Sequence, residues 1–103
     1  MYKRGDVVTL EFPYKENRTI TKRRPVVILE IFVKDECYVC KVTKTNRSGQ
    51  LPGKWVLKDS PDGKIMGLDN DSFVSSSDTI TVKMGVIKAK IGECPFIEEI
   101  DPS

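Results

Sequence analysis

The feature that most constrains the fold is an apolar run at residues 26–33, VVILEIFV, in which only Glu30 is polar. Most of its residues are β-branched, which favours a strand. Because the run lacks polar alternation, it predicts a central strand that is buried on both faces. The rest of a chain of 103 residues would then cover this strand as one domain over residues 1–103, with a single modest core.

Three further segments have strand character. Residues 7–12 alternate until Pro13 ends the strand, residues 38–43 alternate in the same way, and residues 55–57 form a short apolar stretch. A tight turn at residues 34–36 would join the central strand to the strand at 38–43 as an antiparallel hairpin. These strands predict an antiparallel sheet.

The second half of the chain is expected to add a turn and a helix. Residues 60–63, SPDG, have the composition of a type I turn, with a hairpin return through residues 64–66. Residues 81–91 have helical periodicity and are followed by Gly92, while CPFIEEI would form one closing helical turn. The predicted fold class is mainly β, a small and strongly bent sheet or barrel with one main helix near the C-terminus.

The three cysteines are expected to be structural thiols. Cys37 and Cys40 form a C-x-x-C, but their spacing in a strand places them on opposite faces. No second cysteine pair and no histidine exists to complete a zinc site, so no metal or cofactor is expected. The N-terminus lacks an apolar signal segment, and no stretch approaches the length of a membrane helix, so a cytoplasmic protein is expected.

Charge is distributed unevenly along the chain. Residues 1–58 hold 13 Lys and Arg against 6 Asp and Glu, whereas residues 59–103 hold 4 against 9. This asymmetry predicts either a polyanion partner for the first half or charge balance between the two halves within the fold. Because the chain has no histidine, acid–base chemistry would need a carboxylate or lysine with a shifted pKa, or a well-placed arginine or tyrosine.

Cations gather at the start of the central strand, where Arg23 and Arg24 precede Pro25. The antiparallel hairpin would bring the end of the next strand, with Lys41, Thr43 and Lys44, beside these two arginines. Guanidinium groups and a hydroxyl suit a phosphate or a phosphoryl transition state. The alternative is an edge of the sheet whose cations only prevent aggregation.

Three blocks in order resemble the PemK/MazF family of toxin–antitoxin toxins: KRGDVVTLEFPY, KRRPVVIL and GLDNDSFV followed by DTITVKMGVIKAKIG. The resemblance implies a small SH3-like barrel of the PemK/MazF/CcdB type that works as a homodimer. It also implies a sequence-specific, metal-independent endoribonuclease that cuts single-stranded RNA through attack by the RNA's own 2′-hydroxyl. A cognate antitoxin protein would neutralise it by occupying the RNA groove.

The resemblance also assigns roles to residues. Arg24 would be the main catalytic residue, Thr43 a second contact to the transition state, and Asp78 either the general base or the first residue of the predicted helix. Five cations would hold flanking phosphates: Lys22, Arg23, Lys41, Lys44 and Arg47. The loop at residues 15–22, with Lys15 and Arg18, would be a mobile cover that binds the RNA and contacts the antitoxin. Many relatives have a serine where this chain has Lys44, so an altered active site is an open alternative.

The sequence leaves two alternative functions open, and it leaves alternative roles open for three further residues. A toxin of the same fold could inhibit DNA gyrase by binding alone, and a silent SH3-like binding module would have no activity. Trp55 is expected in the core or a dimer interface, with base stacking as the alternative. Asp69 and Asp71 are expected to supply turn polarity, with cation binding as the alternative.

Overall fold

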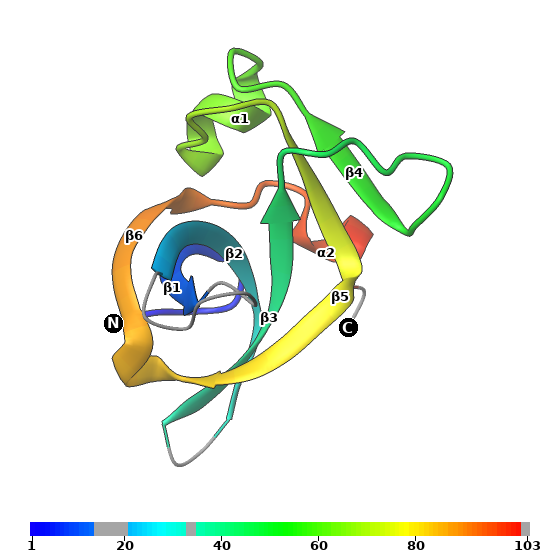
Figure 1. Cartoon of the computed structure of the whole chain (residues 1–103). Coiled ribbons are helices and arrows are strands. Elements are labelled where there is room, and N and C mark those ends of the chain that lie inside the picture. The colour runs from blue at the N-terminus through cyan, green and yellow to red at the C-terminus, as the bar shows by residue number, and fades with distance from the viewer. Residues whose placement is uncertain (14–20, 33–34, 102–103) are drawn as a thin grey trace.

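The computed structural model describes residues 1–13, 21–32 and 35–101. Its main feature is a six-stranded antiparallel sheet with the strand order β4-β5-β3-β2-β1-β6. The strands are β1 (Asp6–Pro13), β2 (Thr21–Phe32), β3 (Glu36–Thr43), β4 (Gly53–Val56), β5 (Ser72–Lys83) and β6 (Ile87–Glu93). In Figure 1, β5 and β6 curve around β1 and β2, which confirms the strongly bent sheet, and its two edges are β4 and β6.

Short helices accompany the sheet in the described ranges. They are α1 (Pro61–Met66), the 3-10 turn η1 (Met84–Val86) and α2 (Ile97–Ile100). The closing turn predicted in CPFIEEI is α2, so this prediction is confirmed. Within the described ranges, none of the helices has the length and apolar character of a membrane span.

The strand β2 lies in the middle of the sheet between β3 and β1, as its apolar run predicts. Residues 26–29 are buried, but Glu30, Ile31 and Phe32 are exposed. The prediction of burial on both faces is therefore right for the first half of the run and wrong for residues 30–32. The physical reason is that residues 30–32 pair with β3, whereas the pairing of β2 with β1 ends at Val27. In Figure 1 this end of β2 and β3 projects from the rest of the sheet.

Side chains of the central strands alternate between two apolar clusters, one on each face of the sheet. Val26 and Ile28 belong to one cluster, and Val27 belongs to the other. Cys37 and Cys40 divide between the clusters in the same way, which confirms the prediction that they point to opposite faces.

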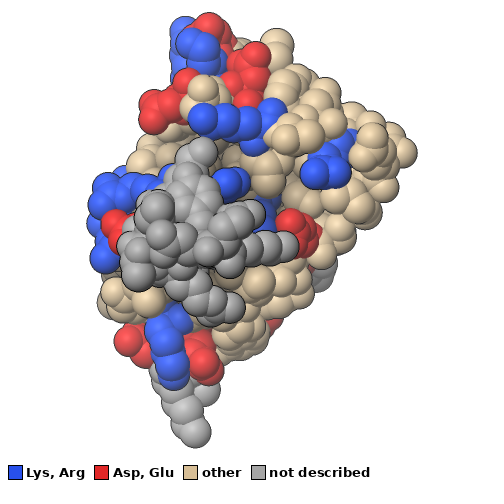
Figure 2. Space-filling model, in the orientation of Figure 1, with Lys and Arg blue, Asp and Glu red and all other residues tan. Residues whose placement is uncertain are grey.

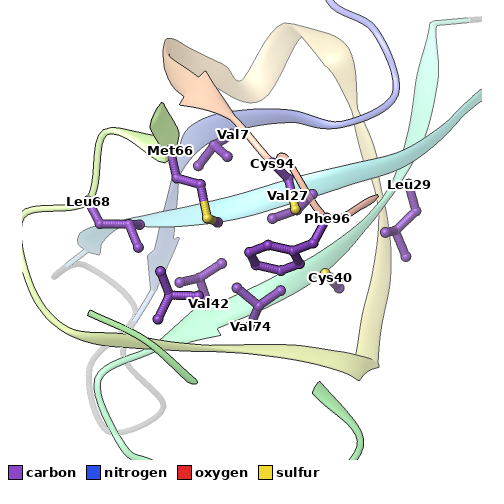
Figure 3. Packing of buried hydrophobic residues seen from close by; sticks show 11 residues of the cluster. Val7, Val27, Leu29, Cys40, Val42, Met66, Leu68, Val74, Cys94 and Phe96 are labelled. Atoms are coloured by element: carbon purple, nitrogen blue, oxygen red, sulfur yellow. The ribbon is translucent and has the colours of Figure 1, made fainter. Parts of the chain in front are cut away.

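The larger cluster connects the sheet to the second half of the chain. Figure 3 shows the Phe96 ring at its centre, between Val27 of β2 and Val74 of β5, with Met66 and Cys94 beside it. Because Met66 is completely buried, α1 is fixed against the sheet by its last residue. This packing decides where the chain after α1 runs.

The predicted helix at residues 81–91 does not form. The segment instead contains the end of β5, the turn η1 and most of β6. In this arrangement residues 79–83 pair with β3, and residues 87–93 pair with β1. The backbone groups of two strands thereby gain partners, whereas a helix rich in β-branched residues and interrupted by Gly85 would have low intrinsic stability. Asp78 accordingly lies within β5 and does not begin a helix.

The predicted turn at residues 60–63 and the strand at 64–66 are also wrong, because these residues form α1. Ser60 is the N-cap, and its Oγ accepts a hydrogen bond from the Gly63 N–H at 3.1 Å. Pro61 occupies the first helical turn, where its missing N–H has no cost, and Gly67 ends the helix with φ +71°. The pattern Ser-Pro followed by a late glycine is thus a pair of helix caps.

Charge balance within the fold explains much of the asymmetry between the two halves. Lys3 contacts Glu93 at 3.0 Å, Arg4 contacts Asp101 at 2.7 Å, and Lys54 contacts Glu99 at 3.3 Å. Each pair joins a cation of the first half to an acid of the second. Figure 2 accordingly shows acidic and basic side chains interspersed over the visible face.

Candidate active site

A pocket lies where β2 and β3 separate. Their pairing runs to Val26 and Lys41. Beyond this pair, residues 23–25 of β2 remain paired with β1, while Thr43 of β3 remains paired with β5. Pro25 stands at the point of separation and has no N–H to donate to a neighbouring strand. The two strands of one hairpin therefore diverge and leave a space between their ends.

The pocket has a volume of about 540 Å³, which is within the range of about 300–1,000 Å³ that is typical of small-molecule sites. Its wall is formed by both diverging strands, the segment after α1, and parts of β1 and β6. The lining residues are Thr9, Arg23, Arg24, Pro25, Val42, Thr43, Lys44, Thr45, Gly67, Leu68, Asp69, Asn70, Ser72 and Ile91. A space of this size can accept one nucleotide unit of a chain.

The structure brings together four of the predicted site residues. Arg23, Arg24, Thr43 and Lys44 all line the pocket. Arg24 is exposed, so its guanidinium can reach a ligand, and Thr43 is half-buried with its Oγ1 donating to the Thr45 carbonyl at 3.2 Å. Arg23 lies 3.8 Å from Glu11. These positions create a cationic wall with a hydroxyl beside it, a suitable surface for a phosphate.

The other predicted contacts are arranged differently. Lys41 and Asp78 lie outside the pocket lining and pair with one another at 3.9 Å across β3 and β5. Arg47 is exposed in the loop after β3 and is also not part of the lining. The roles of these three residues stay predictions.

Three predicted cations cannot be placed as side chains. Lys15 and Arg18 lie outside the described residues. Lys22 belongs to β2, where its backbone faces Phe12 of β1, and nothing more is described of it. Their proposed RNA contacts also stay predictions.

The pocket contains a carboxylate that sequence reasoning did not assign to it, on Asp69. The prediction treated Asp69 and Asp71 alike as polar turn residues, and for Asp71 this is correct, because its carboxylate accepts the backbone N–H of Lys58 at 2.9 Å. Asp69 instead lines the pocket with Asn70 and Ser72. The helix caps around α1 were the signal that could have placed this segment against the sheet.

The segment after α1 is held firmly on both sides of Asp69. Gly67 approaches β6 so closely that a Cβ atom there would lie 2.0 Å from the Ile91 carbonyl oxygen, and Leu68 is buried in the larger apolar cluster. On the other side, the Ser72 Oγ donates to the Asn70 carbonyl at 2.8 Å. Asp69 is therefore an exposed side chain on a braced turn.

The cysteines are unsuited to metal binding or redox chemistry. All three are buried free thiols, and burial raises the pKa of Cys40 to about 12 and that of Cys94 to about 11. Thiolates are the reactive and metal-binding form, so these residues are inert at neutral pH. In the described part of the chain, no three His, Cys, Asp or Glu residues are grouped as metal ligands would be.

Comparisons with known proteins agree with this architecture. In three dimensions the chain is similar to a protein in the crystal structure of MazE-MazF (Form-III) from Deinococcus radiodurans, with a TM-score of 0.70, 16% sequence identity, and coverage of 96% of this chain and 88% of that one. At this identity the similarity establishes the fold. None of the curated proteins matches the chain in sequence.

The family comparison covers almost the whole sequence. The profile described as "PemK-like, MazF-like toxin of type II toxin-antitoxin system" matches residues 3–98. The match includes both strands that diverge at the pocket and the whole segment after α1. This chain belongs to the PemK-like, MazF-like toxins of type II toxin–antitoxin systems.

Proposed function

We propose that this toxin is a metal-independent, sequence-specific endoribonuclease that cleaves single-stranded RNA, with messenger RNA in the cytoplasm as its target. The observation that carries the proposal is the pocket between β2 and β3, where the guanidinium of Arg24 and the hydroxyl of Thr43 come from two diverging strands. Membership of the toxin family supports the same conclusion.

The proposed reaction is attack of a ribose 2′-hydroxyl on the adjacent phosphodiester, which gives a 2′,3′-cyclic phosphate and a free 5′-hydroxyl. Charge increases on the non-bridging oxygens as the phosphorus becomes pentacoordinate. Arg24 would donate hydrogen bonds to these oxygens and protonate the departing 5′-oxygen, and Thr43 would be a second contact. Fixed donors of this kind stabilise the transition state without a metal ion.

The flanking cations would hold the phosphates on either side of the cut. Arg23 and Lys44 line the pocket and are the nearest candidates. Lys41 and Arg47 would act on the chain outside the pocket, together with Lys15, Arg18 and Lys22. Contacts of this kind add affinity without reading sequence.

The proposal includes two protein partners. A cognate antitoxin would neutralise the toxin by occupying the RNA site, in keeping with the family and with the similarity to a MazE-MazF structure. A second copy of the chain would complete a homodimer. Size-exclusion chromatography with light scattering tests the second partner directly.

The deciding experiment incubates purified protein with a long single-stranded RNA in the presence of EDTA and maps the new ends by sequencing. Discrete cuts with 2′,3′-cyclic phosphate ends are expected, and a 2′-deoxy substitution at the cut site should abolish them. Arg24→Ala should lower the rate by about 10²- to 10³-fold. Arg24→Lys is the matched control, because it keeps the charge but loses the planar fork and should recover only part of the rate.

The RNA assay, combined with an assay of DNA supercoiling by gyrase, distinguishes the alternative functions. Intact RNA together with blocked supercoiling by DNA gyrase would favour a gyrase-inhibiting toxin. Intact RNA with no effect on gyrase would favour a binding module without catalysis. Cleavage that requires added Mg²⁺ would contradict the metal-independent mechanism.

A further inference from the structure

We propose that Asp69 is the general base that accepts the proton of the attacking 2′-hydroxyl. This inference rests on the proposed ribonuclease function and assigns the proton acceptor that the function requires. A 2′-hydroxyl becomes a strong nucleophile only as its proton leaves, and a positioned base typically contributes about 10²- to 10⁴-fold to such a step.

The chemistry of the pocket leaves one group for this role among the described residues. The chain has no histidine, and the charged pocket residues on β2 and after β3 are the cations Arg23, Arg24 and Lys44. The remaining polar side chains of the lining are hydroxyls and the amide of Asn70, which do not accept a proton at neutral pH. Asp69 supplies the only carboxylate in the described lining.

The turn that carries Asp69 holds it in place. Gly67 and buried Leu68 fix the turn on one side, and Asp71 and Ser72 fix it on the other through hydrogen bonds of 2.9 and 2.8 Å. Among the described residues, no hydrogen bond or ion pair engages the Asp69 side chain itself. A side chain that is not used by the fold and lies on a rigid support is suited to a catalytic role.

The charges in the pocket also support a proton-transfer role. A carboxylate repels a phosphate, so the charge of Asp69 disfavours RNA binding. A role in catalysis would explain why a carboxylate lies in this pocket. Arg23, Arg24 and Lys44 line the same pocket, so the carboxylate and the cations that would hold the phosphate border one space. Asp78, the base suggested by the sequence, instead pairs with Lys41 outside the lining.

The proposed step balances as follows. The 2′-oxygen forms a bond to phosphorus while its proton passes to a carboxylate oxygen of Asp69, and the bond from phosphorus to the 5′-oxygen breaks. The 5′-oxygen takes a proton from the Arg24 guanidinium. Water then returns a proton to Arg24 and removes one from Asp69, so the enzyme is restored without any other reactant.

The test is single-turnover cleavage of an RNA that contains one cut site by the full chain and by Asp69→Asn. The variant has nearly the same shape but cannot accept the proton, so the rate should fall by about 10²- to 10⁴-fold. Asp59→Asn is the matched control and should cleave at the wild-type rate. Asp59 is exposed, lies outside the pocket lining, and pairs with its neighbour Lys58 at 3.7 Å. Asp78→Asn tests the competing base.

Two further measurements exclude a merely structural role for Asp69. In wild type the cleavage rate should rise with pH on the acidic side of the pH profile, because the base must lose its proton. In Asp69→Asn this rise should be absent. The comparison uses the pH range in which circular dichroism shows both proteins folded. An RNA with sulfur in place of the 5′-bridging oxygen has a better leaving group. This RNA should restore the part of the Arg24→Ala rate that depends on protonation of the leaving oxygen, but should not raise the rate of Asp69→Asn relative to wild type.

These experiments distinguish failure of the Asp69 assignment from failure of the proposed ribonuclease function. If wild type leaves RNA intact, the ribonuclease proposal fails and this inference fails with it. If wild type cleaves and Asp69→Asn cleaves at the same rate, or if only Asp78→Asn loses activity, the ribonuclease proposal stands and Asp69 is not the base. Affinity of Asp69→Asn for a 2′-deoxy RNA that equals or exceeds that of wild type, together with a slower rate, supports the assignment.

Discussion

Among the described residues, the cations at the N-terminal turn and two of the cations at the pocket, Arg24 and Lys44, have contrasting electrostatic surroundings. At the N-terminal turn, Lys3 and Lys90 lie 3.1 and 3.2 Å from the carboxylate of Asp6, which is completely buried. At the pocket, Arg24 and Lys44 have no carboxylate within ion-pair distance among the described residues. The comparison shows that a cluster of cations in the sequence does not by itself indicate a ligand. Cations that acids neutralise hold the fold together, whereas those left without acids are available to a polyanion.

The pKa values of the N-terminal group show how strongly it is coupled to the fold. Burial alone would raise the pKa of Asp6, but hydrogen bonds from the backbone and side chain of Lys3 and from Lys90 outweigh it and lower the pKa. The hydrogen bond with Lys3 also lowers the pKa of Glu93. These carboxylates are therefore more stable as anions in the folded protein than in the unfolded chain.

The largest expected effect is a selective loss of activity at the pocket. Arg24→Ala should lower the cleavage rate by about 10²- to 10³-fold and leave the thermal midpoint within a few degrees of wild type, because the side chain is exposed. Circular dichroism and single-turnover assays on the same preparation check both. A large fall in the midpoint would mean that this cation also holds the fold, which would break the comparison.

The opposite effect is expected at the N-terminal turn. Asp6→Ala should lower the free energy of unfolding by about 2–4 kcal/mol, because it removes several charge-assisted hydrogen bonds from a buried position. Urea titration measures this, with exposed Asp59→Ala as a control that should cost less than about 0.5 kcal/mol. Cleavage by the folded Asp6→Ala protein should match wild type, and a matching loss of activity would contradict the division into two groups.

The contribution of these carboxylates to stability should also be measurable in the wild-type protein, from the effect of acid on unfolding. Because the folded-state pKa values of Asp6 and Glu93 are lowered, their contribution to stability is complete at neutral pH and is lost as the pH falls below their ordinary values of 3.8 and 4.5. Urea midpoints measured from pH 7 to pH 3 should stay level above about pH 5 and then fall. In Asp6→Ala the fall should be shallower, and an equal slope would remove Asp6 from the explanation.

The smallest expected effect concerns Arg47, which is exposed outside the pocket lining. If it contacts an RNA phosphate, Arg47→Ala should reduce the slope of log affinity against log salt by about 0.7 for a single strand. Affinity for an uncleavable 2′-deoxy RNA at several salt concentrations measures the slope. An unchanged slope would remove Arg47 from the set of phosphate contacts. A reduced slope would show that the cations that bind RNA include one outside the pocket lining.

The sequence could place Arg23, Arg24 and Lys44 at one edge of the sheet, because two local signals indicate this arrangement. Pro25 immediately precedes the apolar run and so marks where it begins, and the hairpin sets which end of β3 lies beside Arg24. The position of Asp69 in the pocket was not predicted, because no local signal in the sequence indicates it. Its position depends on α1, and the caps of that helix, Ser60 and Gly67, have the same composition as a turn.

The sequence by itself determined the central strand, the faces of Cys37 and Cys40, and the cations at the start of β2. Each follows from a signal within a few residues: a continuous apolar run, the alternation of side chains along a strand, or a proline. Only the tertiary structure decided that residues 81–91 extend the sheet and that Asp69 reaches the pocket. Both outcomes depend on partners distant in the chain: the backbone of β1 and β3 for residues 81–91, and β6 for the turn that carries Asp69. Local periodicity cannot encode such partners, because backbone hydrogen bonds between strands and close packing against a neighbouring strand form only when the chain has folded.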